Sequence, residues 1–268
     1  MKVKKRLDVL LVERGLSENR TKAQAVIMSG LVDVNGQRAD KPGVSYEETV
    51  DIQIRGAACP YVSRGGLKLE KALRDFGVHP VDYVCSDSGA STGGFTDCLL
   101  QQGAKKVFAI DVGYGQLAWK LRQDPRVVNL ERTNVRFLEA DSLGELVDCF
   151  TIDVAFISLD KVLPSAYKIL KPDGFGIALI KPQFEAGREK VGKKGVVRDP
   201  AVHLEVIEKV IGQARELGFV PLGLDFSPIR GPEGNIEYLF YMGKQGEDAV
   251  SPERIREVVA ASHETLEK

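Results

Sequence analysis

The chain has 268 residues, of which 43% are hydrophobic and 28% are charged, and these proportions exclude a disordered or collagen-like protein. Its formal net charge of −1 excludes nucleic-acid binding through overall basicity, so such binding requires local patches. The cysteines Cys59, Cys85, Cys98 and Cys149 form no CxxC pair. This pattern argues against a disulfide framework or a metal site, and it predicts buried thiols in a reducing compartment.

The first segment, MKVKKRLDVLLVERG, is basic, but Asp8 and Glu13 interrupt its apolar run, so it does not match a signal peptide. No stretch of the chain approaches the ~20 uncharged apolar residues of a transmembrane helix. We therefore expect a cytoplasmic protein that does not enter a membrane.

Residues 1–60 predict a small module of two helices and a hairpin sheet. Leucines at helical spacing predict a first helix that stops at Gly15, and a second helix, capped by residues 17–19, ends at Gly30. Asn35-Gly36 between two short apolar runs is a strong signal for a tight hairpin, and VDIQI adds a further strand.

The charge of this module is only weakly biased, with ten Lys and Arg against eight Asp and Glu in residues 1–60, a net of +2. A solvated helix face explains such a bias as well as RNA binding does. The spacing favours RNA, because Arg20 and Lys22 lie near a helix N-terminus, where backbone donors also attract phosphate. The other basic residues of its helices and hairpin are Arg6, Arg14, Arg38 and Lys41.

From residue 64 onward, predicted helices and strands alternate, which is typical of a doubly wound, mainly parallel sheet of the Rossmann-like type. The pattern includes a helix over about 114–123, an apolar strand FTIDVAFISL, a strand NIEYLFYM, and a long helix that Asp199-Pro200 begin. The predicted organisation is an α+β RNA-binding domain over 1–58, a linker over 59–63 and an α/β domain over 64–268.

The stretch SDSGASTGGFTD follows the first strand of the α/β domain and contains Gly89, Gly93 and Gly94. It lacks the middle glycine of the dinucleotide fingerprint, and Asp87 would repel a phosphate. S-adenosylmethionine suits this loop better. The carboxylate of Asp87 would attract the ammonium group of the cofactor, and Asp111 would accept hydrogen bonds from both ribose hydroxyls. Asp111 as an ordinary helix cap is the alternative. Asn134, after the next strand, would reach the adenine.

Four charged residues stand at or near the ends of predicted elements: Lys68, Asp153, Lys181 and Glu237. A charge in an apolar strand is costly unless it is paired. Asp153 and Lys181 end neighbouring strands, so each is expected to compensate the other. A structural ion-pair network without catalytic function is the alternative reading.

The N-terminal motif, RLDVLLVERGL…RTKAQAVIMSGLVDVNGQ…KPG, resembles the RNA-binding domain named after ribosomal protein S4. The stretches SRGGLKL, DVAFISLD, IKPQFE and IEYLFY resemble the Lys-Asp-Lys-Glu tetrad of the FtsJ-like RNA ribose 2'-O-methyltransferases, and DSGASTGGFTD resembles their cofactor loop. The combination of the two domains resembles the TlyA family, also called hemolysin A-like.

This resemblance implies methyl transfer from S-adenosylmethionine to a cytidine 2'-hydroxyl of ribosomal RNA, without a metal. The expected partner is ribosomal RNA within a ribosomal subunit. Lys181 is the expected base within the catalytic set Lys68, Asp153, Lys181 and Glu237. The implied cofactor contacts are Asp87, Ser88, Gly89, Gly93, Gly94, Phe95, Asp111 and Asn134, the last standing where the family carries an acidic residue. The expected RNA contacts are Arg6, Arg20, Lys22, Lys41, Arg64, Arg188, Lys193 and Lys194.

The segment EAGREKVGKKGVVR, residues 185–198, is basic and rich in glycine. It is either an exposed surface loop or a segment that closes over RNA. Two other functions compete with methyl transfer: a non-catalytic RNA-binding or ribosome-assembly protein, and a membrane-active hemolysin. The complete tetrad argues against the first, and the lack of an apolar span argues against the second.

Overall fold

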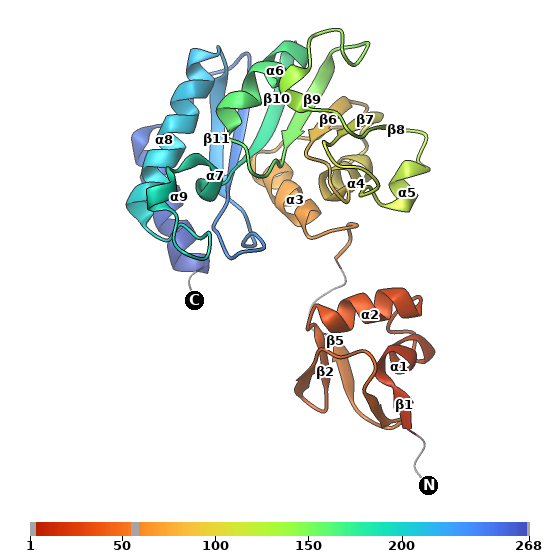
Figure 1. Ribbon diagram of the computed structural model, residues 1–268. Helices are drawn as coiled ribbons and strands as arrows, with labels where there is room; N and C mark the ends of the chain where they lie inside the picture. The colour runs from red at the N-terminus through yellow and green to blue at the C-terminus, as the bar shows by residue number, and fades with distance from the viewer. Residues whose placement is uncertain (1–3, 55–58, 267–268) are drawn as a thin grey trace. The chain divides into compact units, whose positions relative to one another are not determined.

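The computed structural model describes residues 4–54 and 59–266. The chain divides into two compact units, residues 1–60 and residues 61–268 (Figure 1). The last three of the five predicted linker positions, residues 61–63, belong to the second unit. Tyr61 is buried there, and its hydroxyl donates a hydrogen bond to Glu70. Part of the connector sequence GAACP, residues 56–58, lies outside the described residues.

The N-terminal unit contains the two predicted helices, α1 (Leu7–Glu13) and α2 (Arg20–Met28). The side chain of Asn19 caps α2 by accepting a hydrogen bond from the backbone N–H of Lys22. The apolar faces of both helices pack on the strands around a small core that includes Leu7, Leu11 and Ile27. The predicted module of two helices with a hairpin sheet is therefore confirmed.

The strands of this unit are short. An antiparallel sheet of order β3-β2-β5 is formed by β2 (Val32–Val34), β3 (Gln37–Ala39) and β5 (Ile52–Ile54). Asn35 and Gly36, at φ values of 51° and 75°, form the tight turn of the predicted hairpin. A second pair, β1 (Lys4–Arg6) with β4 (Ser45–Glu47), was not predicted, because three residues carry too little alternation to read as a strand.

The second unit is a sheet of order β11-β12-β10-β9-β6-β7-β8 with helices on both faces, which confirms the doubly wound fold. Strands β8, β7, β6, β9 and β10 are parallel, whereas β12 is antiparallel to both β10 and β11. The strands are β6 (Val84–Ser88), β7 (Lys106–Ile110), β8 (Val127–Leu130), β9 (Val147–Ile152), β10 (Leu170–Ile180), β11 (Val220–Phe226) and β12 (Tyr238–Gly243). The helices are α3 (Gly65–Asp75), α4 (Gly94–Gln101), α5 (Trp119–Arg122), α6 (Leu163–Ile169), α7 (Pro182–Glu185), α8 (Pro200–Glu216) and α9 (Pro252–Leu266), with 3-10 turns η1 (Val135–Phe137), η2 (Leu159–Lys161) and η3 (Arg188–Lys190).

Alternate residues of the strands enter two cores on opposite faces of the sheet. Phe150 and Ile152 of β9 join α6, α8 and α9 in one core, whereas Cys149, which directly precedes Phe150, joins α3 and α4 in the other. This is the pattern expected of strands that are covered on both sides. Cys85, Cys98 and Cys149 are buried, as predicted, and Cys59 is exposed.

Two predicted elements differ from the structure. The helix expected over 114–123 is reduced to α5, because residues 112–118 form bends in which Gly115 takes a φ of 74°. The strand expected over FTIDVAFISL ends at Ile152, and Asp153 begins the following loop. Glu237 likewise lies just before β12 rather than within it.

Of the helices in the two described ranges, none combines the length and the apolar character that are needed to span a bilayer. Within the same ranges, no cluster of three or more His, Cys, Asp and Glu side chains is arranged to hold a metal ion.

Asp8 is the main polar group in the core of the N-terminal unit. It is fully buried, and it accepts hydrogen bonds from Arg6 (3.0 Å), Gln24 (2.7 Å) and Arg20 (3.0 Å). The Arg6 guanidinium, followed by Gln24 and Arg20, holds the pKa of this carboxyl well below its usual range despite the burial. Arg6 and Arg20, both predicted to contact RNA, are thus oriented by Asp8 while about half of each side chain stays exposed.

Replacing Asp8 with Asn is expected to destabilise the N-terminal unit at neutral pH by about 1–3 kcal/mol, because two arginines lose a charged acceptor. The depressed pKa means that the wild-type advantage is present above pH ~4 and is lost as the pH falls below that value. Hydrogen exchange of α1 and α2 between pH 3 and 7 measures this. Equal protection of wild type and Asp8→Asn at pH 7 would contradict the assignment.

Candidate active site

The four predicted catalytic residues gather at one edge of the large sheet. Asp153 follows the last residue of β9, and Lys181 follows the last residue of β10. Glu237 reaches the same edge from the other direction, because β12 is antiparallel to β10 and Tyr238 pairs with Ile180. Lys68 is contributed by α3, which packs on the face of this sheet.

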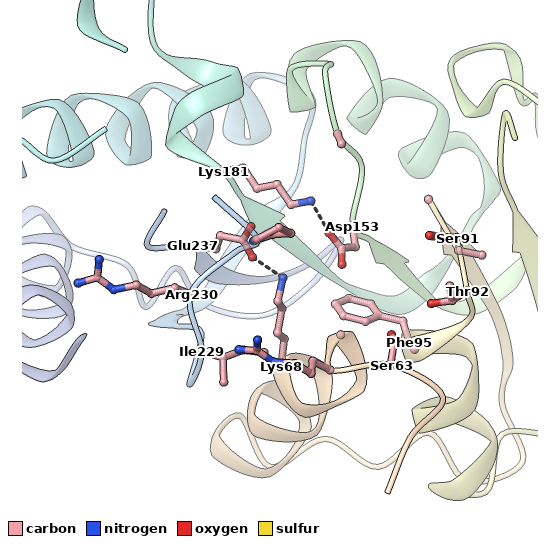
Figure 2. A pocket seen from close by; sticks show the side chains of 17 residues that line it. Ser63, Lys68, Ser91, Thr92, Phe95, Asp153, Lys181, Ile229, Arg230 and Glu237 are labelled. Atoms are coloured by element: carbon pink, nitrogen blue, oxygen red, sulfur yellow. Dashed lines mark hydrogen bonds and ion pairs between the residues drawn. The ribbon is translucent and has the colours of Figure 1, made fainter. Parts of the chain in front are cut away.

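These side chains form two ion pairs, which Figure 2 shows side by side. Lys181 Nζ lies 2.5 Å from Asp153 Oδ1, and Lys68 Nζ lies 2.5 Å from Glu237 Oε2. The expected pairing of Asp153 with Lys181 is confirmed. The Lys68–Glu237 pair is the more buried, since the two side chains are 8% and 1% exposed, against 11% for Lys181 and 20% for Asp153.

All four residues line a cavity of about 460 Å³, the target cavity. Phe95 and Arg64, predicted as a cofactor contact and an RNA contact, also line it. Buried ion pairs in a concave site are candidates for chemistry, because the cost of burying the charges must be compensated.

A second cavity of about 510 Å³, the cofactor cavity, lies over the ends of β6, β7 and β9. Asp111 and Asn134 line it, as do the backbone-rich segments 112–113 and 133–136. The Asp111 carboxylate accepts hydrogen bonds from the backbone N–H groups of Ser91 and Gly113, each at 2.7 Å, which fixes its orientation. It is therefore a fixed acceptor at the strand end, where nucleoside ligands bind in doubly wound folds.

The two cavities share one wall. Gly89, Ser91, Asp153 and Ala155 line both of them. A group that is passed from one cavity to the other would therefore move past these shared residues. The arrangement suits a transfer reaction between two bound molecules, with the ion pairs on one side and Asp111 on the other.

The glycines of the loop are required by contacts within the protein. A Cβ added at Gly89, whose φ is +83°, would lie 2.5 Å from the backbone oxygen of Asp153. A Cβ at Gly93, whose φ is +99°, would overlap the side chains of Leu117 and Leu121. One at Gly94 would lie 2.9 Å from the backbone nitrogen of Gly66 at the start of α3. The loop thus brings α3, β6 and β9 close together, while Gly89 also borders both cavities.

Of the predicted cofactor contacts, Gly89, Asp111 and Asn134 line the cofactor cavity, Gly94 and Phe95 line only the target cavity, and Asp87, Ser88 and Gly93 line neither. Asp87 is fully buried, lines neither cavity, and accepts hydrogen bonds from Thr96 (2.7 Å) and Thr151 (3.0 Å). Burial raises the pKa of Asp87 to about 6. Ser88 is also buried, and its carbonyl accepts a hydrogen bond from the backbone N–H of Asp153. Both residues position the loop from beneath, and direct contact with a cofactor stays a prediction for them.

The remaining predicted RNA contacts are exposed. Lys22 and Lys41 lie on the N-terminal unit, where Lys22 pairs with Glu18. Arg188, Lys193 and Lys194 lie in the segment after α7. Their exposure is compatible with RNA binding.

Sequence reasoning missed two polar residues next to the tetrad. Arg230 borders the target cavity, but its side chain points away from the ion pairs (Figure 2) and donates hydrogen bonds to the backbone oxygens of Leu266 and Gly234. Asn235 is 1% exposed and bonds to the backbone of the basic segment. The stretch IRGPEGN just before Glu237 was the available signal, because a Gly- and Pro-containing loop next to a site residue often carries function.

Comparison with known proteins agrees with this geometry. Residues 61–244 match the FtsJ-like methyltransferase family, and residues 5–49 match the S4 domain. The 16S/23S rRNA (cytidine-2'-O)-methyltransferase TlyA of Mycobacterium tuberculosis is 43% identical over 95% of this chain and 95% of its own. Hemolysin A of Brachyspira hyodysenteriae is 43% identical over 87% of this chain and 98% of its own. A solved structure from Streptococcus thermophilus that bears a hemolysin name is 47% identical, with a TM-score of 0.79 over 100% of this chain and 98% of that one.

Replacing Gly89 with Ala is expected to destabilise the protein by about 2 kcal/mol or more and to weaken S-adenosylmethionine binding, because the new Cβ adds a clash with Asp153 to the backbone strain. Gly77→Ala is the matched control: its φ is +66°, but no atom lies within 4 Å of the added Cβ. It should cost only about 1 kcal/mol, with unchanged cofactor binding. Thermal unfolding and calorimetric titration measure both, and equal effects would refute a role of close packing at Gly89.

Proposed function

This chain belongs to the FtsJ-like methyltransferase family, within its TlyA branch, and from that membership we propose that it transfers a methyl group from S-adenosylmethionine to the ribose 2'-hydroxyl of a cytidine in ribosomal RNA. The observation that carries the proposal is the wall shared by two cavities, with the Lys-Asp-Lys-Glu tetrad on one side and Asp111 on the other. Methyl transfer needs two ligands whose reacting atoms meet.

The residues of the cofactor cavity fit S-adenosylmethionine. Asp111 offers a fixed carboxylate for ribose hydroxyls, Asn134 lies on the wall of the same cavity, and Gly89 keeps the wall free of a side chain. When it is bound, this cofactor supplies a methyl group on a positively charged sulfur. The carboxylates of Asp111 and Asp153 in its lining suit that positive charge better than they would suit a phosphate.

On the target side, the chain must remove a proton and hold the ribose. A hydroxyl becomes a good nucleophile only when a base takes its proton as the new bond forms. Lys181 in its neutral form is the proposed base, with the proton received at Nζ and Asp153 orienting that nitrogen from 2.5 Å. Lys68, held by Glu237, places a positive charge where the oxygen is deprotonated. Alignment of the reacting atoms supplies much of the remaining rate.

The partner is RNA, and we propose that it is bound within a ribosomal subunit in the cytoplasm. The S4 domain match supports an RNA-binding role for the N-terminal unit. There, Arg6, Arg20, Lys22 and Lys41 would contact phosphates, and Arg64 would do so at the target cavity. Phosphate contacts of this kind give affinity that weakens as salt is added.

Replacing Lys181 with Ala is expected to reduce methyl transfer by about 10²–10⁴-fold, because the base is lost. Cofactor affinity should stay close to that of the wild type, because Lys181 lines only the target cavity. The measurement is transfer of label from S-adenosylmethionine to purified large and small ribosomal subunits from a strain that lacks this gene. Lys71→Ala is the matched control, since Lys71 is also an ion-paired lysine but pairs with Asp75 and Asp225 outside the cavity. It should transfer at close to the wild-type rate.

Near-normal transfer by Lys181→Ala would remove Lys181 from the mechanism. Cofactor binding by the wild type without label in either subunit would instead favour the non-catalytic RNA-binding protein. Mapping the labelled ribose identifies the target nucleotide.

A further inference from the structure

The basic segment, residues 188–198, connects the two ion pairs of the tetrad along the chain. It begins shortly after Lys181, because only α7 and two further residues lie between Lys181 and Arg188. It ends at residues that are bonded to the loop carrying Glu237. Each end of the segment is therefore tied to one member of a different pair.

Two buried side chains fix the far end of this segment. Asn235 donates a hydrogen bond to the backbone oxygen of Gly195 and accepts one from the N–H of Val197, both at 2.9 Å. The ring of His203 contacts the backbone oxygen of Val197 at 3.0 Å and the hydroxyl of Tyr238 at 2.7 Å. Asn235 and His203 are 1% and 0% exposed, so water does not readily replace these bonds.

These same contacts flank Glu237. Asn235 precedes it by two residues, and Tyr238 follows it directly. The backbone oxygen of Glu237 accepts a hydrogen bond from Ser227, and a Cβ at Gly231 would lie 2.5 Å from its carboxylate. Glu237 is 1% exposed and is held by these neighbours, so a displacement at Gly195–Val197 would be passed to it through Asn235.

The segment also carries exposed positive charge. In the part of the chain that the structure describes, Arg188, Lys193, Lys194 and Arg198 form no salt bridge, whereas Lys190 pairs with Glu205. Positive side chains gathered in one short segment repel one another, and bound RNA phosphates would relieve that repulsion. RNA would therefore favour one arrangement of the segment over others, as a ligand must if it is to shift a conformational equilibrium.

We propose that RNA phosphates bound by the basic segment help to hold the tetrad in its paired arrangement, and that Asn235 is the positioning residue that couples the segment to Glu237. This inference rests on the proposed function and deepens it. RNA contacts at the segment would then increase the turnover rate, whereas contacts on the N-terminal unit would increase affinity alone. Binding energy raises kcat only when it is used to form the reactive geometry.

The test compares kcat and KM for the subunit that the wild type methylates. In the segment variant, Arg188, Lys193 and Lys194 are each replaced with Gln; since all three are exposed, folding should be preserved. We expect its kcat to fall about ten-fold or more and its KM to rise. Lys22→Gln with Lys41→Gln should raise KM and leave kcat within about two-fold of wild type. Lys168→Gln, Arg254→Gln and Arg256→Gln together remove the same charge elsewhere and should change neither parameter.

Asn235→Ala should lower kcat by a similar factor at nearly unchanged KM and cofactor affinity. Asn235→Asp keeps the acceptor for Val197 but loses the donor to Gly195, so an intermediate kcat is expected. Should Asn235→Ala not fold, Asn235→Asp and the segment variant decide the question. A segment variant that changes KM alone, or wild-type kcat in a folded Asn235 variant, overturns the coupling. Absence of transfer by the wild type instead counts against the proposed function.

Discussion

The antiparallel pairing of β12 with β10 is the constraint on which the site depends. Because Tyr238 lies opposite Ile180, the residues just outside the two strands, Glu237 and Lys181, meet at one edge of the sheet. In a parallel β12, Glu237 would lie at the opposite edge, about 20 Å away for a six-residue strand. The one strand that breaks the parallel pattern is thus the strand that completes the tetrad.

Four charges at this edge are stable only as two pairs, and each pair joins different elements. Lys68 on α3 meets Glu237 before β12, and Asp153 after β9 meets Lys181 after β10. Removing one partner leaves the other charge poorly solvated, so the pairs also hold α3 and the strand ends in place. The geometry of the site and the stability of this edge therefore depend on the same contacts.

Much of this arrangement was predictable because short-range patterns in the sequence indicate it. Alternating helices and strands indicated the doubly wound sheet, Asn35-Gly36 indicated the hairpin, and strand-end charges indicated the Asp153–Lys181 pair. The prediction of a helix over 114–123 was wrong, because bends around Gly115 replace the first half of that segment. Asp8 and Asn235 were missed for another reason: each has partners far along the chain, such as Arg20 for Asp8 and Gly195 for Asn235, and no local period reports such contacts.

The glycine loop was correctly predicted to lie at the site, but the physical reason for its glycines differs from the expected one. Glycines in such loops are expected to admit a ligand, yet here a side chain at Gly89 would first strike the backbone of Asp153. The closeness of β6 and β9 at that point lets Gly89 and Asp153 line both cavities, so the two cavities adjoin each other. A methyl group can cross only a short distance between reacting atoms, about 3–3.5 Å in a reactive arrangement. Adjoining cavities are then as necessary to the proposed transfer as the tetrad itself, because no protein atom can stand between the reacting oxygen and the methyl group. Asp153 serves both requirements: its backbone packs against Gly89 where the cavities meet, and its carboxylate pairs with Lys181.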